Sequence, residues 1–81
     1  MTGSGLAEQV LALVGGTENV ETVTHCFSRL RFVLHDDAVA DDAAIGALPD
    51  VVMVLRQGGQ LQVAVRSGVM TLHAEVVALL A

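Results

Sequence analysis

Apolar side chains recur every three or four residues in two segments, as they do on a helix with one buried face. The first segment predicts a helix over residues 5–14, which Gly15-Gly16 is suited to end. The second predicts an amphipathic helix over the last residues of the chain. The periodic positions are Leu6, Val10, Leu13 and Val14 in the first helix and Leu72, Val76, Leu79 and Leu80 in the second.

Four other segments predict strands. Residues 20–24 are short and β-branched, and residues 29–34 alternate between two faces. Residues 51–57 and 60–66 are apolar runs separated by Gly58-Gly59, a dipeptide suited to the positive φ angles of a two-residue hairpin turn. The alternation places Leu30, Phe32 and Leu34 opposite Arg29, Arg31 and Val33, and a buried face of Leu61, Val63 and Val65 opposite a wet face of Gln62, Ala64 and Arg66.

An acidic segment lies between the two predicted hairpins. Asp36-Asp37 breaks the strand pattern, and Asp41-Asp42 suits the first turn of a short helix over residues 41–48. Pro49 ends that helix, because the residue before a proline resists helical backbone angles. The acidic residues are therefore predicted to occupy a loop and a helix N-terminus rather than a metal site, since no histidine or further carboxylate stands at ligand spacing.

The predicted order is helix, strand, strand, helix, strand, strand, helix. Two hairpins in this order form most simply an α+β fold with a four-stranded antiparallel sheet and three helices packed on one face. Residues 1–81 are predicted to be a single domain, with residues 1–4 disordered, because the chain is too short for a second core.

Composition narrows the classes of function. The net charge is −5, and all four basic residues are arginine, which disfavours binding to nucleic acid or to an anionic membrane surface. No run approaches the roughly 20 apolar residues needed to cross a bilayer, and the N-terminus lacks the features of a signal peptide. We therefore expect a cytoplasmic domain that is not inserted in a membrane.

Cys26 is the single cysteine, and it lies at the predicted tight connection between residues 20–24 and 29–34. Arginine beside a thiol favours the thiolate, whose usual pKa is ~8.5, and the guanidinium forks match the oxygens of a phosphoryl group. Backbone N–H groups of a tight loop can add donors. Two interpretations stay open from the spacing: Arg29 and Arg31 form an anion site with a reactive thiol, or they are exposed arginines paired with acids beside a cysteine that only packs.

Two stretches of the sequence carry a resemblance to a known family. Residues 15–20 read Gly-Gly-Thr-Glu-Asn-Val, and residues 26–31 read Cys-Phe-Ser-Arg-Leu-Arg. They resemble the enzyme IIB domain of the glucose superfamily of the bacterial phosphoenolpyruvate-dependent sugar phosphotransferase system, whose pattern is Gly-Gly-x-Glu-Asn-Ile/Val followed by Cys-x-Thr-Arg-Leu-Arg. The likeness continues through Leu48-Pro49, residues 51–55 and residues 58–63, and the triplet Thr-His-Cys is closest to the β-glucoside, sucrose and trehalose branch.

The resemblance implies a phosphoryl carrier. Cys26 would receive a phosphoryl group from a phosphohistidine of a IIA partner and donate it to a sugar held by a membrane-embedded IIC partner. Arg29 and Arg31 match the arginines that surround the phosphocysteine. The resemblance also implies a four-stranded antiparallel sheet with three helices on one side, no cofactor or metal, a location at the inner face of the membrane through IIC, and a monomer when isolated.

Several other residues are candidates for the site. Ser28 stands where the family usually has threonine and keeps a hydroxyl for the loop or the phosphate. Phe27 is either a rim residue for partners or core filler, and His25 is either a general base or a feature of the subgroup. Arg66, where many relatives have glycine, is either a third phosphate contact or a solvated charge.

Two rival functions remain. The first is a non-catalytic IIB-like regulatory interaction module, in which phosphorylation only controls binding. The second is a thiol-redox protein, which the absence of a resolving cysteine weakens. His35 and His73 are expected to be surface residues without chemistry.

Overall fold

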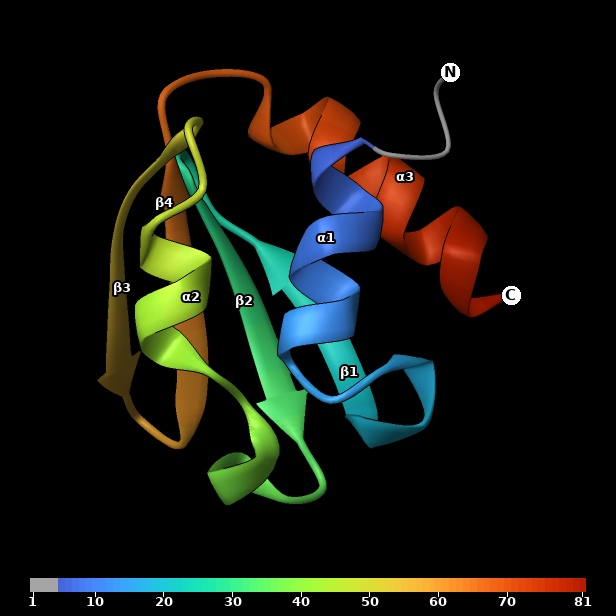
Figure 1. Ribbon diagram of the computed structural model, residues 1–81. Helices are drawn as coiled ribbons and strands as arrows, with labels where there is room; N and C mark the ends of the chain where they lie inside the picture. Colours follow the sequence, from blue (N-terminus) through green and yellow to red (C-terminus); the bar gives the residue numbers. More distant parts are fainter. Residues whose placement is uncertain (1–4) are drawn as a thin grey trace.

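Four strands form one antiparallel sheet in the computed structural model of the chain, which describes residues 5–81 (Figure 1). β1 (Val20–His25) pairs with β2 (Arg29–Leu34), and β3 (Val51–Gln57) pairs with β4 (Gln60–Val65). β2 and β4 join the two hairpins, so the strand order is β1-β2-β4-β3. The predicted α+β fold with two hairpins is confirmed. The disorder predicted for residues 1–4 lies outside the described residues.

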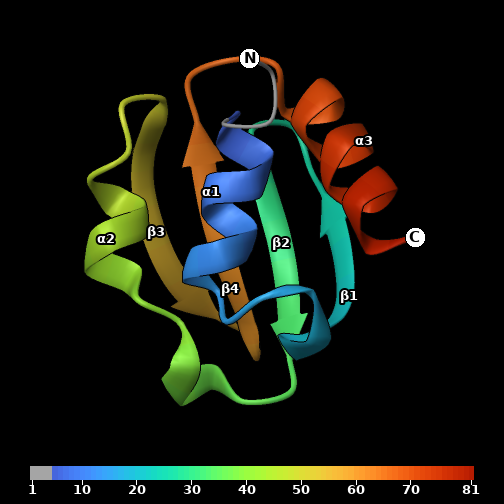
Figure 2. The same cartoon turned by 45° about the vertical axis from the view of Figure 1, so that its right-hand side comes forward.

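Three helices cover one face of this sheet (Figures 1 and 2). α1 (Leu6–Leu13) crosses the middle of the sheet, α2 (Asp42–Gly46) packs over β3, and α3 (Val69–Leu80) lies beside α1 over β1. Two short 3-10 helices, Thr17–Asn19 and Asp37–Val39, were not predicted, because three-residue turns have no periodic pattern to detect.

The core lies between the sheet and the helices, as the alternation predicts. Along β2 the apolar side chains point inward and are buried, while Arg29, Arg31 and Val33 point to the open face and are half-buried. Burying each side chain of this size contributes about 1.5–3 kcal/mol. The fully buried side chains are Val10, Val14, Leu30, Phe32, Ile45, Leu61, Val63 and Val76.

The wet face predicted for β4 is wrong. Gln62 is only 3% exposed and Ala64 only 7% exposed, although both point to the open face of the sheet. β4 lies between β2 and β3, and Gln62 stands opposite Arg31 on one side and Leu55 on the other. Longer side chains on the neighbouring strands therefore cover the shorter ones of the central strand.

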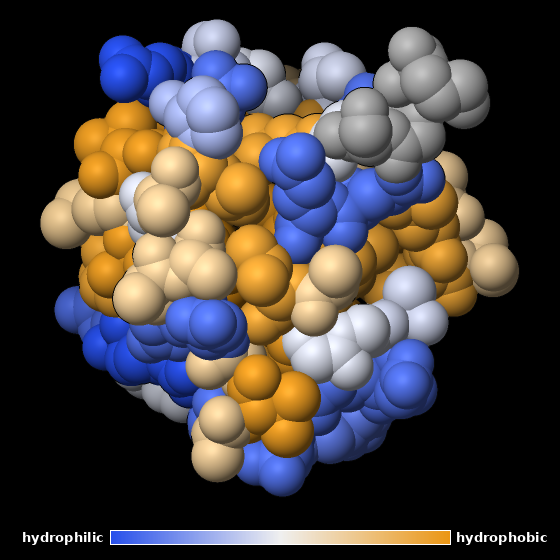
Figure 3. All heavy atoms as spheres, viewed as in Figure 1, coloured by the Kyte–Doolittle hydropathy of each residue, from blue (hydrophilic) through white to orange (hydrophobic). Residues whose placement is uncertain are grey.

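The start of α3 and the burial of one of its residues also differ from the prediction. The helix begins at Val69, three residues before the first periodic position, and Leu79 is 40% exposed rather than buried. Apolar patches remain visible between charged groups on the helical face (Figure 3). Leu79 and Val77 contribute exposed apolar surface on α3.

The glycine pair after α1 ends the helix as predicted. Gly16 N–H donates to the carbonyl of Leu11 at 2.8 Å, and Gly15 N–H donates to that of Ala12 at 3.3 Å. These two bonds are the pattern of a Schellman helix end. Gly15 has φ 111°, and a Cβ there would lie 2.7 Å from Val39. The pair therefore lets the chain turn closely over the segment after β2.

Asn19 ties this turn to the far end of β2. Its side-chain amide donates to the carbonyl of Val14 at 2.7 Å and to that of Asp36 at 3.0 Å, and its Oδ1 accepts from Asp36 N–H at 2.9 Å. Asn19 is 8% exposed, and its bond to Val14 is buried, while its two bonds to Asp36 are partly buried. In residues 15–19, the Gly-Gly-x-Glu-Asn motif therefore ends α1 and holds the following turn against the end of β2.

Asn19→Ala is expected to lower the free energy of unfolding by about 1–3 kcal/mol, because one buried and two partly buried backbone groups lose their partner. Urea denaturation followed by circular dichroism measures this loss. Gln9→Ala, at an exposed position of α1, is the control and is expected to change stability by less than about 0.5 kcal/mol. An equal effect of the two substitutions would show that the Asn19 hydrogen bonds do not hold the turn.

The acidic segment forms helix starts, as predicted. Asp36 caps the 3-10 helix through Ala38 N–H, and Asp41 caps α2 through Ala44 N–H. Asp42 pairs with Arg56 of β3 at 2.8 Å, and this hydrogen bond holds the pKa of the Asp42 carboxyl below its usual range. α2 ends at Gly46, two residues earlier than predicted. Within residues 5–81, no three potential metal ligands cluster together.

Candidate functional site

Cys26 lies in the connection between β1 and β2, where it was predicted. Its N–H donates to the carbonyl of Arg29 at 3.0 Å, which closes the turn. The carbonyl of Ser28 accepts from Val65 N–H at 3.0 Å, which ties the loop to the end of β4. Cys26 is half-buried, whereas the neighbouring Phe27 is 99% exposed, so Phe27 does not fill the core.

The loop and the adjoining strand stabilise the thiolate. The backbone N–H of Ser28 has the largest effect, partial burial opposes it, and the backbone N–H of Arg29 and the Arg31 guanidinium add to it. Together they lower the pKa of Cys26 to about 7. About half of the thiol is therefore ionised at neutral pH, which is the form that acts as a nucleophile.

The two arginines of β2 have no acidic partner. Within residues 5–81, the ion pairs of arginine all belong to Arg56, which takes Asp37 and Asp42. The interpretation that Arg29 and Arg31 pair with nearby acids is therefore wrong. Arg31 Nε is buried without a hydrogen-bond partner in the described chain. The Arg31 guanidinium acts on the Cys26 thiol, and Arg29 lies on the same strand face. Both are candidates to bind an anion there, because guanidinium forks match phosphoryl oxygens.

Gln62 is a site residue that the sequence analysis did not identify. Its Oε1 accepts from Arg29 Nη1 at 3.1 Å across the open face of the sheet. The sequence does contain a signal for it, because Gln62 is a polar residue inside the apolar run of β4. The sequence analysis placed Gln62 on a solvent-exposed face, where a polar side chain needs no protein partner. Only the strand order places this side chain beside Arg29.

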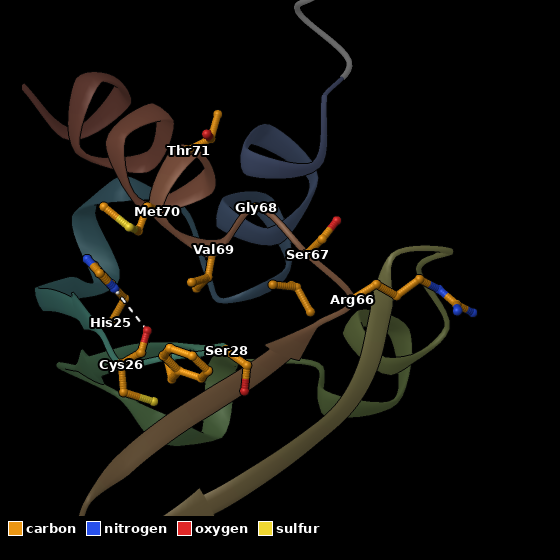
Figure 4. A pocket seen from close by; sticks show the side chains of 11 residues that line it. His25, Cys26, Ser28, Arg66, Ser67, Gly68, Val69, Met70 and Thr71 are labelled. Carbon is orange, nitrogen blue, oxygen red and sulfur yellow. Dashed lines mark hydrogen bonds between the residues drawn. The ribbon is translucent and has the colours of Figure 1, made fainter.

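A cleft of about 590 Å³ opens next to the loop, between it and the segment that joins β4 to α3 (Figure 4). The side chains of His25 and Cys26 leave the backbone in opposite directions, with His25 toward α3 (Figure 4). The cleft is lined by His25, Cys26, Phe27, Ser28, Val65, Arg66, Ser67, Gly68, Val69, Met70 and Thr71.

His25 contacts the loop backbone rather than the thiol. Its Nδ1 lies 3.0 Å from the carbonyl oxygen of Cys26, so a proton on Nδ1 is donated to that oxygen. Its ring contacts the ring of His73, with centroids 4.7 Å apart and the ring planes tilted by 58°. The expectation that His73 is a surface residue is wrong, since it is half-buried and its Nε2 lies 3.3 Å from the carbonyl of Val23.

Arg66 and Ser28 both line the cleft, but they differ in their position relative to Cys26. Ser28 is exposed in the loop next to Cys26. Arg66 lines the cleft with its stem, but its guanidinium extends away from Cys26 (Figure 4), and its Nε lies 3.5 Å from the carbonyl of Pro49. The structure therefore brings together Cys26, Ser28, Arg29 and Arg31, and directs the charge of Arg66 elsewhere.

The alkylation rate of Cys26 by a neutral reagent such as iodoacetamide is expected to rise with pH around a midpoint of about 7. The sign follows from the lowered pKa, because only the thiolate reacts. The urea-unfolded chain is the control, with an expected midpoint of ~8.5. Arg31→Met is expected to raise the folded midpoint only in part, since the loop N–H of Ser28 has the larger effect. A folded midpoint equal to the unfolded one would contradict this electrostatic account.

The chain is similar to several known proteins. Residues 8–41 match the family model described as phosphotransferase system, EIIB. The PTS system arbutin-, cellobiose-, and salicin-specific EIIBC component of Escherichia coli (strain K12) is 43% identical over 77 residues, which cover 95% of this chain and 16% of the relative. The PTS system beta-glucoside-specific EIIBCA component of Bacillus subtilis (strain 168) is 42% identical over 72 residues, 89% of this chain and 12% of the relative.

The fold has a similar solved structure as well. A crystal structure of one domain of the PTS system, IIabc component from Clostridium difficile matches with a TM-score of 0.78 and 25% identity, over 90% of this chain and 76% of that chain. The chain spans about one sixth or less of the length of the two relatives described above. No helix among residues 5–81 is long and apolar enough to cross a membrane. The matched motif, the sheet and these relatives together show that the chain belongs to the EIIB family of the phosphotransferase system.

Proposed function

We propose that Cys26 carries a phosphoryl group from a phosphohistidine of a IIA partner to a sugar bound by a membrane IIC partner. The observation that supports this role is a half-buried thiol with a pKa of about 7, close to the Arg31 guanidinium. Within residues 5–81, neither Arg31 nor Arg29 of the same strand face has an acidic partner. The relatives are named as EIIBC and EIIBCA components, so in them the EIIB unit is joined to the other two kinds of unit. For this chain we propose the same partners, at the cytoplasmic face of the membrane.

In the first step, the Cys26 thiolate attacks the phosphorus atom of the donor. The S–P bond forms as the P–N bond to histidine breaks, and the imidazole keeps the bonding electron pair. In the second step, a sugar hydroxyl gives its proton to a base of the IIC partner or to solvent as its oxygen attacks the same phosphorus, the S–P bond breaks, and Cys26 leaves as a thiolate. A thiol with a pKa near 7 suits both steps, because the thiolate is both available as a nucleophile and stable as a leaving group.

The surrounding groups stabilise the phosphoryl oxygens. Phosphoryl transfer depends on in-line alignment and on neutralising charge at the equatorial oxygens. The loop N–H groups, the Ser28 hydroxyl and the two forks of Arg29 and Arg31 supply those donors from one edge of the sheet. Guanidinium groups can provide the positive charge that a metal ion provides elsewhere.

Both partners must reach the same thiol, so each contact has to be transient. Phe27 is 99% exposed at the tip of the loop, and Met70 is 70% exposed across the cleft. Aromatic residues and methionine are enriched in protein–protein interfaces relative to the rest of the surface. We propose that both partners dock on this rim in turn, and that the isolated chain is a monomer.

Incubation with phosphoenolpyruvate, the general phosphotransferase proteins and a IIA domain tests this proposal. We expect the intact mass of the chain to increase by one phosphoryl group, and adding IIC-containing membranes with sugar to remove that group as sugar phosphate. No increase in mass would overturn the proposed function. Phosphorylation without any transfer to sugar would favour the non-catalytic regulatory module instead.

A further inference from the structure

Gln62 is nearly inaccessible on the open face of the sheet, where side chains are usually solvated. It is 3% exposed and lies on the central strand β4, opposite Arg31 of β2. A buried amide is costly unless its oxygen and nitrogen both have partners. Gln62 has a partner for each, since Oε1 accepts from Arg29 Nη1 at 3.1 Å and Nε2 donates to Gln60 Oε1 at 3.1 Å.

These two bonds determine which way the amide points. Arg29 can only donate, so it requires the oxygen of Gln62 on its side. The oxygen of Gln60 then accepts from the nitrogen on the other side. Rotating the Gln62 amide by half a turn would place donor against donor at Arg29. The Gln62 amide can therefore bond to both Gln60 and Arg29 in one orientation only.

The two arginines have different partners before any phosphoryl group arrives. The Arg31 guanidinium acts on the thiol, whereas Arg29 affects the thiol only through its backbone N–H. The Arg29 side chain instead bonds to Gln62 on the β4 side. Arg29 uses one of its five donors in this bond, so most of its fork remains free for an anion.

We propose that Gln62 is a positioning residue, which Gln60 orients and which holds the Arg29 guanidinium in place for the phosphoryl group on Cys26. Arg31 favours the thiolate, and Arg29 receives phosphoryl oxygens from the β4 side. This division of roles rests on the proposed function, but the position of Arg29 can be measured without phosphoryl transfer.

The first test measures transfer. Gln62→Met keeps the length of the side chain but removes its acceptor, and we expect it to lower kcat for phosphoryl acceptance about tenfold with KM for the phosphorylated donor nearly unchanged. Gln9→Met, an exposed position on α1, is the matched control and should leave both constants unchanged. In an Arg29→Met background Gln62→Met should add almost no loss, whereas in an Arg31→Met background it should keep its full effect.

The second test needs no partner protein. Iodoacetate is an anion and iodoacetamide is neutral, and both alkylate the same thiolate, so the ratio of their rates reports positive charge at the anion site and not the thiol pKa. We expect Gln62→Met to lower this ratio about threefold, Arg29→Met to lower it at least as much, and Gln9→Met to leave it unchanged. Gln60→Met should give a smaller change in the same direction, and it replaces Gln62→Met if that variant does not unfold cooperatively.

Each outcome decides one claim. A ratio that stays constant or rises in Gln62→Met would overturn the positioning role, because Gln62 would then be inert or would hold Arg29 away from the anion. An equal loss of kcat in the Arg29→Met and Arg31→Met backgrounds would also overturn it. If the parent chain accepts no phosphoryl group but the ratio falls as expected, the proposed function fails while the positioning of Arg29 by Gln62 stands.

Discussion

Cys26→Ser is expected to abolish phosphoryl acceptance and to leave the fold unchanged. The substitution replaces one atom of a half-buried side chain, so it creates neither a cavity nor a buried charge. The loop lowers the pKa of the thiol to about 7, but a serine hydroxyl in the same place stays protonated at neutral pH and is a poor nucleophile. Intact mass after incubation with the phosphorylated IIA domain measures acceptance, and thermal denaturation measures the fold.

Ser67→Ala is a suitable control, because Ser67 lines the cleft but lies on the segment after β4 rather than in the Cys26 loop. It is expected to accept the phosphoryl group at the rate of the parent chain. A phosphoryl group that still appears on Cys26→Ser would show a different acceptor, of which the paired His25 and His73 are the nearest candidates.

Arg29→Lys and Arg31→Lys are each expected to slow transfer about 10- to 100-fold. Lysine keeps the positive charge, but all its N–H donors are on one nitrogen atom. It therefore cannot bind two phosphoryl oxygens side by side as a planar guanidinium group does. The loss should be at least as large for transfer to sugar as for acceptance from IIA. Single-turnover rates of the two half-reactions separate these effects.

Arg56→Lys and Arg66→Lys are the matched controls for these variants. Arg56 pairs with Asp37 and Asp42 at the other end of the sheet, and Arg66 extends toward Pro49. Both are expected to transfer phosphoryl groups at the parent rate. Parent rates in Arg29→Lys and Arg31→Lys as well would mean that the forks are not oriented toward the phosphoryl group.

The local elements could be predicted from the sequence because their signals are short-range. Gly58 and Gly59 both have positive φ in the turn between β3 and β4, as a two-residue hairpin requires. In β2 the alternation correctly separated the buried Leu30 and Phe32 from the arginines. The same rule failed on β4, where Gln62 and Ala64 are buried, because alternation along one strand does not report which side chains of the neighbouring strands cover its open face.

Histidine and arginine contacts likewise depended on packing. His73 could not be assigned a partner from the sequence, since its contacts with Val23 and His25 arise when α3 packs over β1. Pairing of Arg29 and Arg31 with nearby acids was one of the two interpretations that the spacing left open. In the fold the acids that pair with arginine, Asp37 and Asp42, meet Arg56 instead.

The sequence by itself determined the order of the elements, both hairpins, and the position of Cys26 at a strand connection, three and five residues before two arginines on one strand face. Each of these depends on residues close together in the chain. The tertiary structure decided that neither arginine of β2 pairs with an acid among residues 5–81. It also decided that β2 and β4 are neighbours, and therefore that Gln62 is buried beside Arg29. Such contacts join residues more than 30 positions apart, and they form only when the two hairpins pair and the helices close over one face of the sheet.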